Sequence, residues 1–90
     1  MIISLLFACS IKSGVTMVKA EQAYQQYNTA ENRQAVYEWT QAEAYLFKAR
    51  EEYADSSFED AEKLALESVL WMEKSAQKAS SETEKTGDEQ

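Results

Sequence analysis

Cys9 is the only cysteine in this chain of 90 residues, and the residues before it indicate what its thiol could do. Leu6, Phe7 and Ala8 lead directly into Cys9, so a bulky apolar residue stands three positions before the thiol and a small one stands next to it. This is the spacing of a bacterial lipobox, in which the cysteine sulfur receives a diacylglyceryl group. The motif therefore predicts that Cys9 is lipidated and becomes the first residue of the mature chain.

The residues before Cys9 are typical of a partial lipoprotein signal segment. Residues 1–8 are apolar except for one serine, although no Lys or Arg precedes Cys9, where a secretory signal normally carries positive charge. The polar stretch from Ser10 to Gly14 predicts a lipidated linker over residues 9–16. The alternative is that residues 1–8 are the apolar N-terminus of a cytosolic protein and pack on its own helices.

Composition excludes several other chemistries. The chain has no histidine, the commonest general base and metal ligand in proteins, so we expect no catalytic residues, no cofactor and no metal site. The net charge of −7 argues against nucleic acid as a partner, because binding phosphates needs a basic surface. It also argues against electrostatic attachment to anionic lipids. Membrane attachment would therefore depend on lipid at Cys9.

The rest of the chain predicts an all-α fold. Proline is absent and there are only two glycines, while the middle of the chain is rich in good helix formers such as Ala, Glu, Lys, Gln and Leu. Apolar residues recur at helical spacing in one stripe, which consists of Ala35, Trp39, Ala42, Tyr45, Leu46, Ala49 and Tyr53. Such a stripe predicts a helix that buries one face.

Two breaks divide this helical pattern. Ala20, Tyr24 and Tyr27 continue nearly the same stripe upstream, so residues 15–53 fit one long helix as well as two. Asn28 with Glu31 could form a helix N-cap pair, which slightly favours a break near Asn28. The next break is clearer.

Near residue 56 the apolar period stops and restarts, and either Ser56 with Glu59 or Ser57 with Asp60 could form a capping box. The last helix is predicted over 57–79, with an inner face made of Phe58, Ala61, Leu64, Ala65, Ser68, Val69, Met72, Ala76 and Ala79. A connection of about three residues makes the two helices antiparallel neighbours. We therefore expect a helical hairpin domain over 17–79, with or without a third N-terminal helix. Residues 80–90 contain no apolar residue and predict a disordered tail.

The hairpin region resembles a known family. From Tyr37 to Ala65 the chain reads YEWTQAEAYLFKAREEYADSSFEDAEKLA. The likeness lies in Tyr37 with Ala42, in Tyr45-Leu46, in Lys48-Ala49-Arg50-Glu51-Glu52, and in the Ser-Ser-Phe turn that leads to Ala61. This pattern resembles domain-of-unknown-function family 4398 (DUF4398), which comprises small bacterial lipoproteins with a TPR-like helical hairpin. The resemblance covers residues 20–79 and implies a cell-envelope lipoprotein with no known activity. Ser68 and Ser75 depart from the family's alanine spacing.

Several apolar residues fall outside the core stripes and are candidate partner-binding residues. These are Val36, Tyr37 and Phe47 on the first predicted helix of the hairpin, and Leu66 and Leu70 on the second. They could mark a partner surface or self-association, or residues 18–27 could fold back over one of these patches as a third helix.

From these observations we expect a lipid-anchored helical adaptor of the cell envelope, on the periplasmic face of the outer membrane or on the cell surface, whose partner is an envelope protein. The alternatives are a soluble cytosolic TPR-like interaction module and a self-assembling helical protein.

Overall fold

The computed structural model describes the backbone of residues 2–88 and the side chains of residues 12–82. Within this part of the chain there are four helices and no strand. The helices are α1 (Ile2–Tyr27), α2 (Ala30–Arg33), α3 (Val36–Ala54) and α4 (Phe58–Asp88). The all-α prediction is confirmed.

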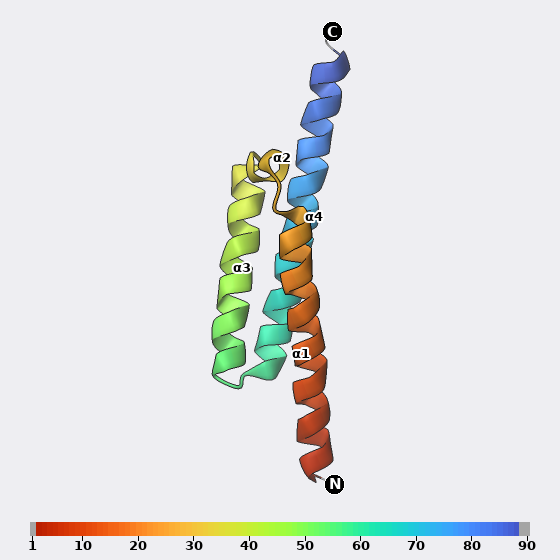
Figure 1. Ribbon diagram of the computed structural model, residues 1–90. Coiled ribbons are helices and arrows are strands. Elements are labelled where there is room, and N and C mark those ends of the chain that lie inside the picture. Colours follow the sequence, from red (N-terminus) through yellow and green to blue (C-terminus); the bar gives the residue numbers. More distant parts are fainter. Residues whose placement is uncertain (1, 89–90) are drawn as a thin grey trace.

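The central element of the fold is α4, because both α3 and α1 pack mainly against it. α3 runs antiparallel to α4, so the two helices form the expected hairpin (Figure 1). α1 runs in the same direction as α4 and is the third, N-terminal helix, and the short α2 connects it to α3 (Figure 1). The result is a rod with principal extents of 64 × 17 × 15 Å.

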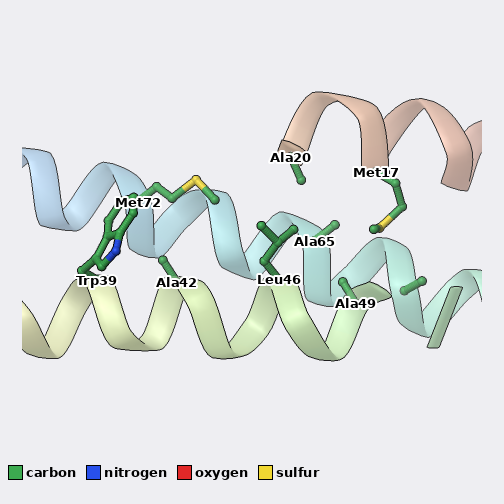
Figure 2. Close-up of a cluster of buried hydrophobic side chains, with 9 residues drawn as sticks. Met17, Ala20, Trp39, Ala42, Leu46, Ala49, Ala65 and Met72 are labelled. Atoms are coloured by element: carbon green, nitrogen blue, oxygen red, sulfur yellow. The ribbon is translucent and has the colours of Figure 1, made fainter. Parts of the chain in front are cut away.

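The core is a narrow stripe of alanines with a few large side chains. The buried residues of α3 are Trp39, Ala42, Leu46 and Ala49, and those of α4 are Ala61, Ala65, Ser68, Met72 and Ser75. All of these residues except Ser75 belong to the inner face that the apolar period predicted for each helix. Because an alanine projects only a methyl group, the helix axes can approach closely. Figure 2 shows Trp39 beside Met72 at one end of the cluster, with Met17 and Ala20 contributed by α1.

The turn between α3 and α4 is closed by backbone hydrogen bonds. The Ser57 N–H donates to the Glu52 carbonyl at 2.8 Å and the Ser56 N–H donates to the Tyr53 carbonyl at 3.0 Å. Ser56 has a φ of 66°. Together these features form a Schellman motif, in which a residue in the left-handed region ends the helix. Glycine normally takes that position, so the β-carbon of Ser56 is held there at a cost.

This turn also settles which of the two predicted capping boxes has the right position. α4 begins at Phe58, so Ser57 is the residue before the helix and Asp60 is its third residue. The Ser56–Glu59 alternative is wrong, because the left-handed Ser56 belongs to the end of α3 and not to the N-cap of α4.

The predicted break near Asn28 is confirmed, since α1 ends one residue before it. The predicted cap is wrong: Thr29, and not Asn28 with Glu31, caps α2, and its side-chain oxygen accepts the Asn32 N–H at 3.2 Å. A second interruption follows at residues 34–35, which the sequence pattern did not predict.

Both ends of the chain differ from expectation. Residues 9–16 lie within α1 and are not an extended linker, because Ser13 is buried against α4 and its hydroxyl donates to the Phe58 carbonyl at 2.9 Å. The disordered tail was predicted over residues 80–90: residues 80–88 instead continue α4, and residues 89–90 lie outside the described residues. Residues 80–88 include Glu and Lys, which propagate an existing helix without a core to pack on.

Candidate lipidation site and interaction surfaces

The predicted lipidation residue lies on the part of α1 that extends past the hairpin. Ser13 is level with Phe58 at the start of α4, and the backbone before Ser13 continues as a helix beyond the α3–α4 turn (Figure 1). Four helical residues correspond to a rise of about 6 Å, so the Cys9 backbone is about one turn outside the bundle. The side chains of Cys9 and of the lipobox residues lie outside the described side chains.

Over the described residues, no helix is both long enough and apolar enough to cross a bilayer.

All five candidate partner-binding residues are exposed, but the structure does not bring them together. Their exposed fractions run from 48% for Leu70 to 66% for Val36. They divide among three regions: Tyr37 beside α4, Val36 and Phe47 along one side of α3, and Leu66 and Leu70 beside α1. A single continuous partner surface made of these five residues is therefore not formed.

The first region is an aromatic pair at the α2 end of the hairpin. The rings of Tyr37 and Trp71 meet edge to face, with centroids 5.6 Å apart. The Lys74 ammonium lies 4.2 Å from the centroid of the Trp71 ring, in the geometry of a cation–π contact. One face of this pair is thus already covered by the chain's own lysine.

The second region is a groove of about 420 Å³ beside Phe47. Leu46 and Ala44 contribute to its apolar lining, and Tyr24 of α1 and Arg50 of α3 line it as well. Val36 is on the same side of α3 as Phe47, because the eleven residues that separate them amount to about three full helical turns.

Polar contacts hold α1 to α3 around this groove. The Arg50 guanidinium donates to both carboxylate oxygens of Glu21, at 2.6 and 2.8 Å, and the Tyr24 hydroxyl donates to Glu43 at 2.7 Å. The Tyr24 ring also stacks on Trp39, with centroids 5.5 Å apart. The hydrogen bond from Arg50 lowers the pKa of the Glu21 carboxyl, and the hydrogen bond to Glu43 raises the pKa of Tyr24. These contacts join α1 to α3 at the groove.

The third region is a more apolar groove of about 470 Å³ between α1 and α4. Ala20 and Ala23 line it from α1, and Leu66 and Leu70 line it from α4. The expectation that residues 18–27 could fold over one of the apolar patches is met only in part, because α1 forms one wall of the groove and leaves both leucines about half exposed. Val15 and Val18 of α1 are exposed as well, and the sequence reasoning did not single them out.

Four of the acidic residues around the turn form ion pairs with lysines. The pairs are Glu51 and Glu52 with Lys48, Glu59 with Lys63, and Glu62 with Lys12, at 3.4–3.6 Å. Over residues 12–82, no group of three or more His, Cys, Asp or Glu side chains is arranged to hold a metal ion.

Two buried serines form hydrogen bonds that sequence reasoning missed. The Ser68 hydroxyl donates to the Ala42 carbonyl across the hairpin at 2.7 Å, and the Ser75 hydroxyl donates to the Met72 carbonyl in its own helix at 2.6 Å. The signal was present, because Ser68 falls on the predicted inner face and Ser75 also interrupts the alanine spacing. Their packing against a partner carbonyl could not be inferred from spacing.

We compared the chain with protein-family models, with curated proteins and with solved structures, and nothing matched in any of the three comparisons. The resemblance to family 4398 therefore stays a prediction.

Proposed function

We propose that this protein is a lipid-anchored, non-catalytic helical adaptor of the cell envelope, tethered through Cys9. The observation that carries the proposal is the position of the lipobox on α1. The motif lies on a helical segment that extends past the α3–α4 turn (Figure 1), so a lipid on Cys9 displaces no residue of the core.

The tether would act by holding the rod close to a bilayer. A diacylglyceryl group supplies two acyl chains, and two chains anchor a protein firmly where one binds only marginally. The α3–α4 turn is about one helical turn from Cys9, so this end of the hairpin faces the membrane. Ser10 follows the cysteine where Asp would be an inner-membrane signal in enteric bacteria, which favours the outer membrane.

The surfaces offered to an envelope protein are the apolar grooves and the aromatic pair. Phe47 is 61% exposed beside the groove between α1 and α3, and the chain as a whole has a net charge of −7. An apolar side chain flanked by basic residues would complement this surface.

Metabolic labelling tests the tether. Cells expressing the gene with its native upstream sequence are grown with an alkyne analogue of palmitate, and the chain is then isolated and coupled to a fluorophore. We expect label on the wild-type chain, recovery with the membranes, and loss of both in Cys9→Ala. Because Cys9 is the only cysteine, no second thiol can take its place, and Ser10→Ala is the matched control that should keep both. A wild-type chain that is unlabelled and wholly soluble would refute the proposal and favour the cytosolic module.

A further inference from the structure

We propose that the groove between α1 and α4 is a homodimer interface. A second copy of the chain packs on it in the antiparallel direction, with the leucines at the centre and Lys19 of each copy paired with Glu73 of the other. This inference does not depend on the lipid at Cys9.

The apolar part of this surface is larger than a single exposed side chain. Leu66 and Leu70 are 53% and 48% exposed one turn apart on α4, and Ala20 and Ala23 of α1 continue the apolar lining. About half of each leucine side chain could still be buried by a partner. A two-fold interface contains two leucines from each copy, so it buries four such side chains.

The two walls of the groove carry opposite charges. Lys19 lies on the α1 wall and Glu73 on the α4 wall, and both are exposed. Neither residue takes part in the ion pairs formed within residues 12–82. The surface therefore has a free cation on one wall and a free anion on the other.

The levels of these residues along the rod follow from the contact between Ser13 and Phe58. The Ser13 hydroxyl donates to the Phe58 carbonyl, and α1 and α4 run in the same direction (Figure 1), so these two residues mark one level. At a rise of about 1.5 Å per residue, Lys19 is about 9 Å and Glu73 about 22 Å beyond that level. The two charges are thus about 13 Å apart along the axis.

The leucines lie at the middle of that interval. By the same rise, Leu66 is about 12 Å and Leu70 about 18 Å beyond the level of Phe58, on either side of the midpoint at about 16 Å. A two-fold axis at the midpoint, perpendicular to the rod, exchanges the levels of Lys19 and Glu73. It brings Lys19 of one copy to the level of Glu73 of the other and places it over the α4 wall that carries Glu73. The symmetry produces this pairing twice.

This self-complementarity is the reason for choosing a second copy as the occupant. An unrelated helix needs no particular placement of Lys19 relative to Glu73, whereas an isologous interface requires opposite charges at equal distances from its axis. A parallel dimer would leave each lysine level with a lysine. In the antiparallel dimer the two Cys9 residues are at opposite ends of the pair.

Charge exchange provides the sharpest test. The full chain with Cys9→Ser, which prevents disulfide-linked dimers, is examined by sedimentation equilibrium. Lys19→Glu and Glu73→Lys should each raise the dimer dissociation constant about tenfold, because each creates two like-charge contacts. If net charge alone controlled association, the two substitutions would have opposite effects, because Glu73→Lys reduces the negative charge of the chain and Lys19→Glu increases it. Within one copy the two residues are farther apart than the Debye length of ~8 Å at physiological salt, so the thermal midpoints of the monomers should hardly change.

Mixing the two weakened variants should restore association. The heterodimer of Lys19→Glu with Glu73→Lys contains two opposite-charge contacts, as does the homodimer of a chain with both substitutions. Both should have dissociation constants within about threefold of that of the chain with the wild-type surface.

The leucines are tested separately. Leu66→Ser with Leu70→Ser should weaken the dimer at least about 100-fold, while Phe47→Ser, which removes an equally exposed apolar side chain from another surface, should leave it unchanged. A chain that stays monomeric up to about 1 mM, or single variants that weaken the dimer without restoration on mixing, would overturn the proposal.

Discussion

The hydroxyl of Ser68 links α4 to α3, and its removal should lower stability measurably. Ser68 is fully buried and donates to the Ala42 carbonyl at 2.7 Å. That carbonyl also accepts a bond within α3, so Ser68→Ala removes one hydrogen bond and leaves no orphaned acceptor. A net loss of about 1 kcal/mol is expected for the bond, offset by about 0.5 kcal/mol because alanine is the better helix former.

Ser75→Ala is the matched control. Ser75 is equally buried, but its hydroxyl donates to Met72 of its own helix at 2.6 Å, so the substitution gains the same helix propensity without breaking a contact between helices. We expect Ser75→Ala to be neutral or slightly stabilising, and Ser68→Ala to be about 1 kcal/mol less stable than Ser75→Ala.

The difference is measured by urea unfolding followed by circular dichroism, with all chains at one concentration, and it corresponds to about 4–8 °C in Tm for a domain of this size. Equal midpoints for the two variants would refute the idea that the hydrogen bond of Ser68 between helices contributes to stability.

Two further predictions concern stability. Ser56→Gly should raise the free energy of unfolding by about 0.5 kcal/mol, because glycine takes the left-handed φ without a β-carbon penalty but gains entropy in the unfolded chain; Ser57→Gly is the control, and an equal gain there would contradict the reasoning. Glu21→Gln should lower stability at pH 7 by less than about 1 kcal/mol, since the pair with Arg50 is partly exposed. The Arg50 hydrogen bond lowers the pKa of Glu21 from 4.5, so the contribution of the pair is present above pH 4.5 and is lost as the pH falls through the pKa of the folded state. Thermal melts of both chains from pH 7 to pH 2 should therefore converge in acid, and a gap that widened there would contradict the assignment.

Much of the hairpin could be predicted because it depends on local periodicity. Trp39, Ala42 and Leu46 recur at helical spacing, and a helix with one apolar stripe has one face to bury. The break after α1 and the turn near Ser56 were also readable, since they combine polar capping residues with a loss of the apolar period. The capping details were readable only in part: Ser57 was one of two predicted caps before α4, whereas the Thr29 cap of α2 was not predicted, because which backbone amide a polar side chain reaches depends on the local backbone geometry.

The ends of the helices were misjudged for a physical reason. A polar stretch such as residues 80–88 says that no core is buried there, but it does not say that the backbone is irregular, because an established helix propagates at little cost. Ser13 was assigned to a linker because it is polar, and it is buried because Phe58 offers a carbonyl at the right place.

The lipobox at Cys9 is a local pattern that can be recognised without a fold, and its chemistry is a prediction from spacing alone. The arrangement of the exposed apolar surfaces, by contrast, depends on the tertiary structure. Phe47, Tyr37 and Leu66 were all recognisable as apolar residues off the core stripes, yet their separation into three regions depends on where α1 packs. Its position is set by contacts between residues distant in the chain, mainly with α4, such as the hydrogen bond from Ser13 to the Phe58 carbonyl, and these contacts form only once the helices pack together.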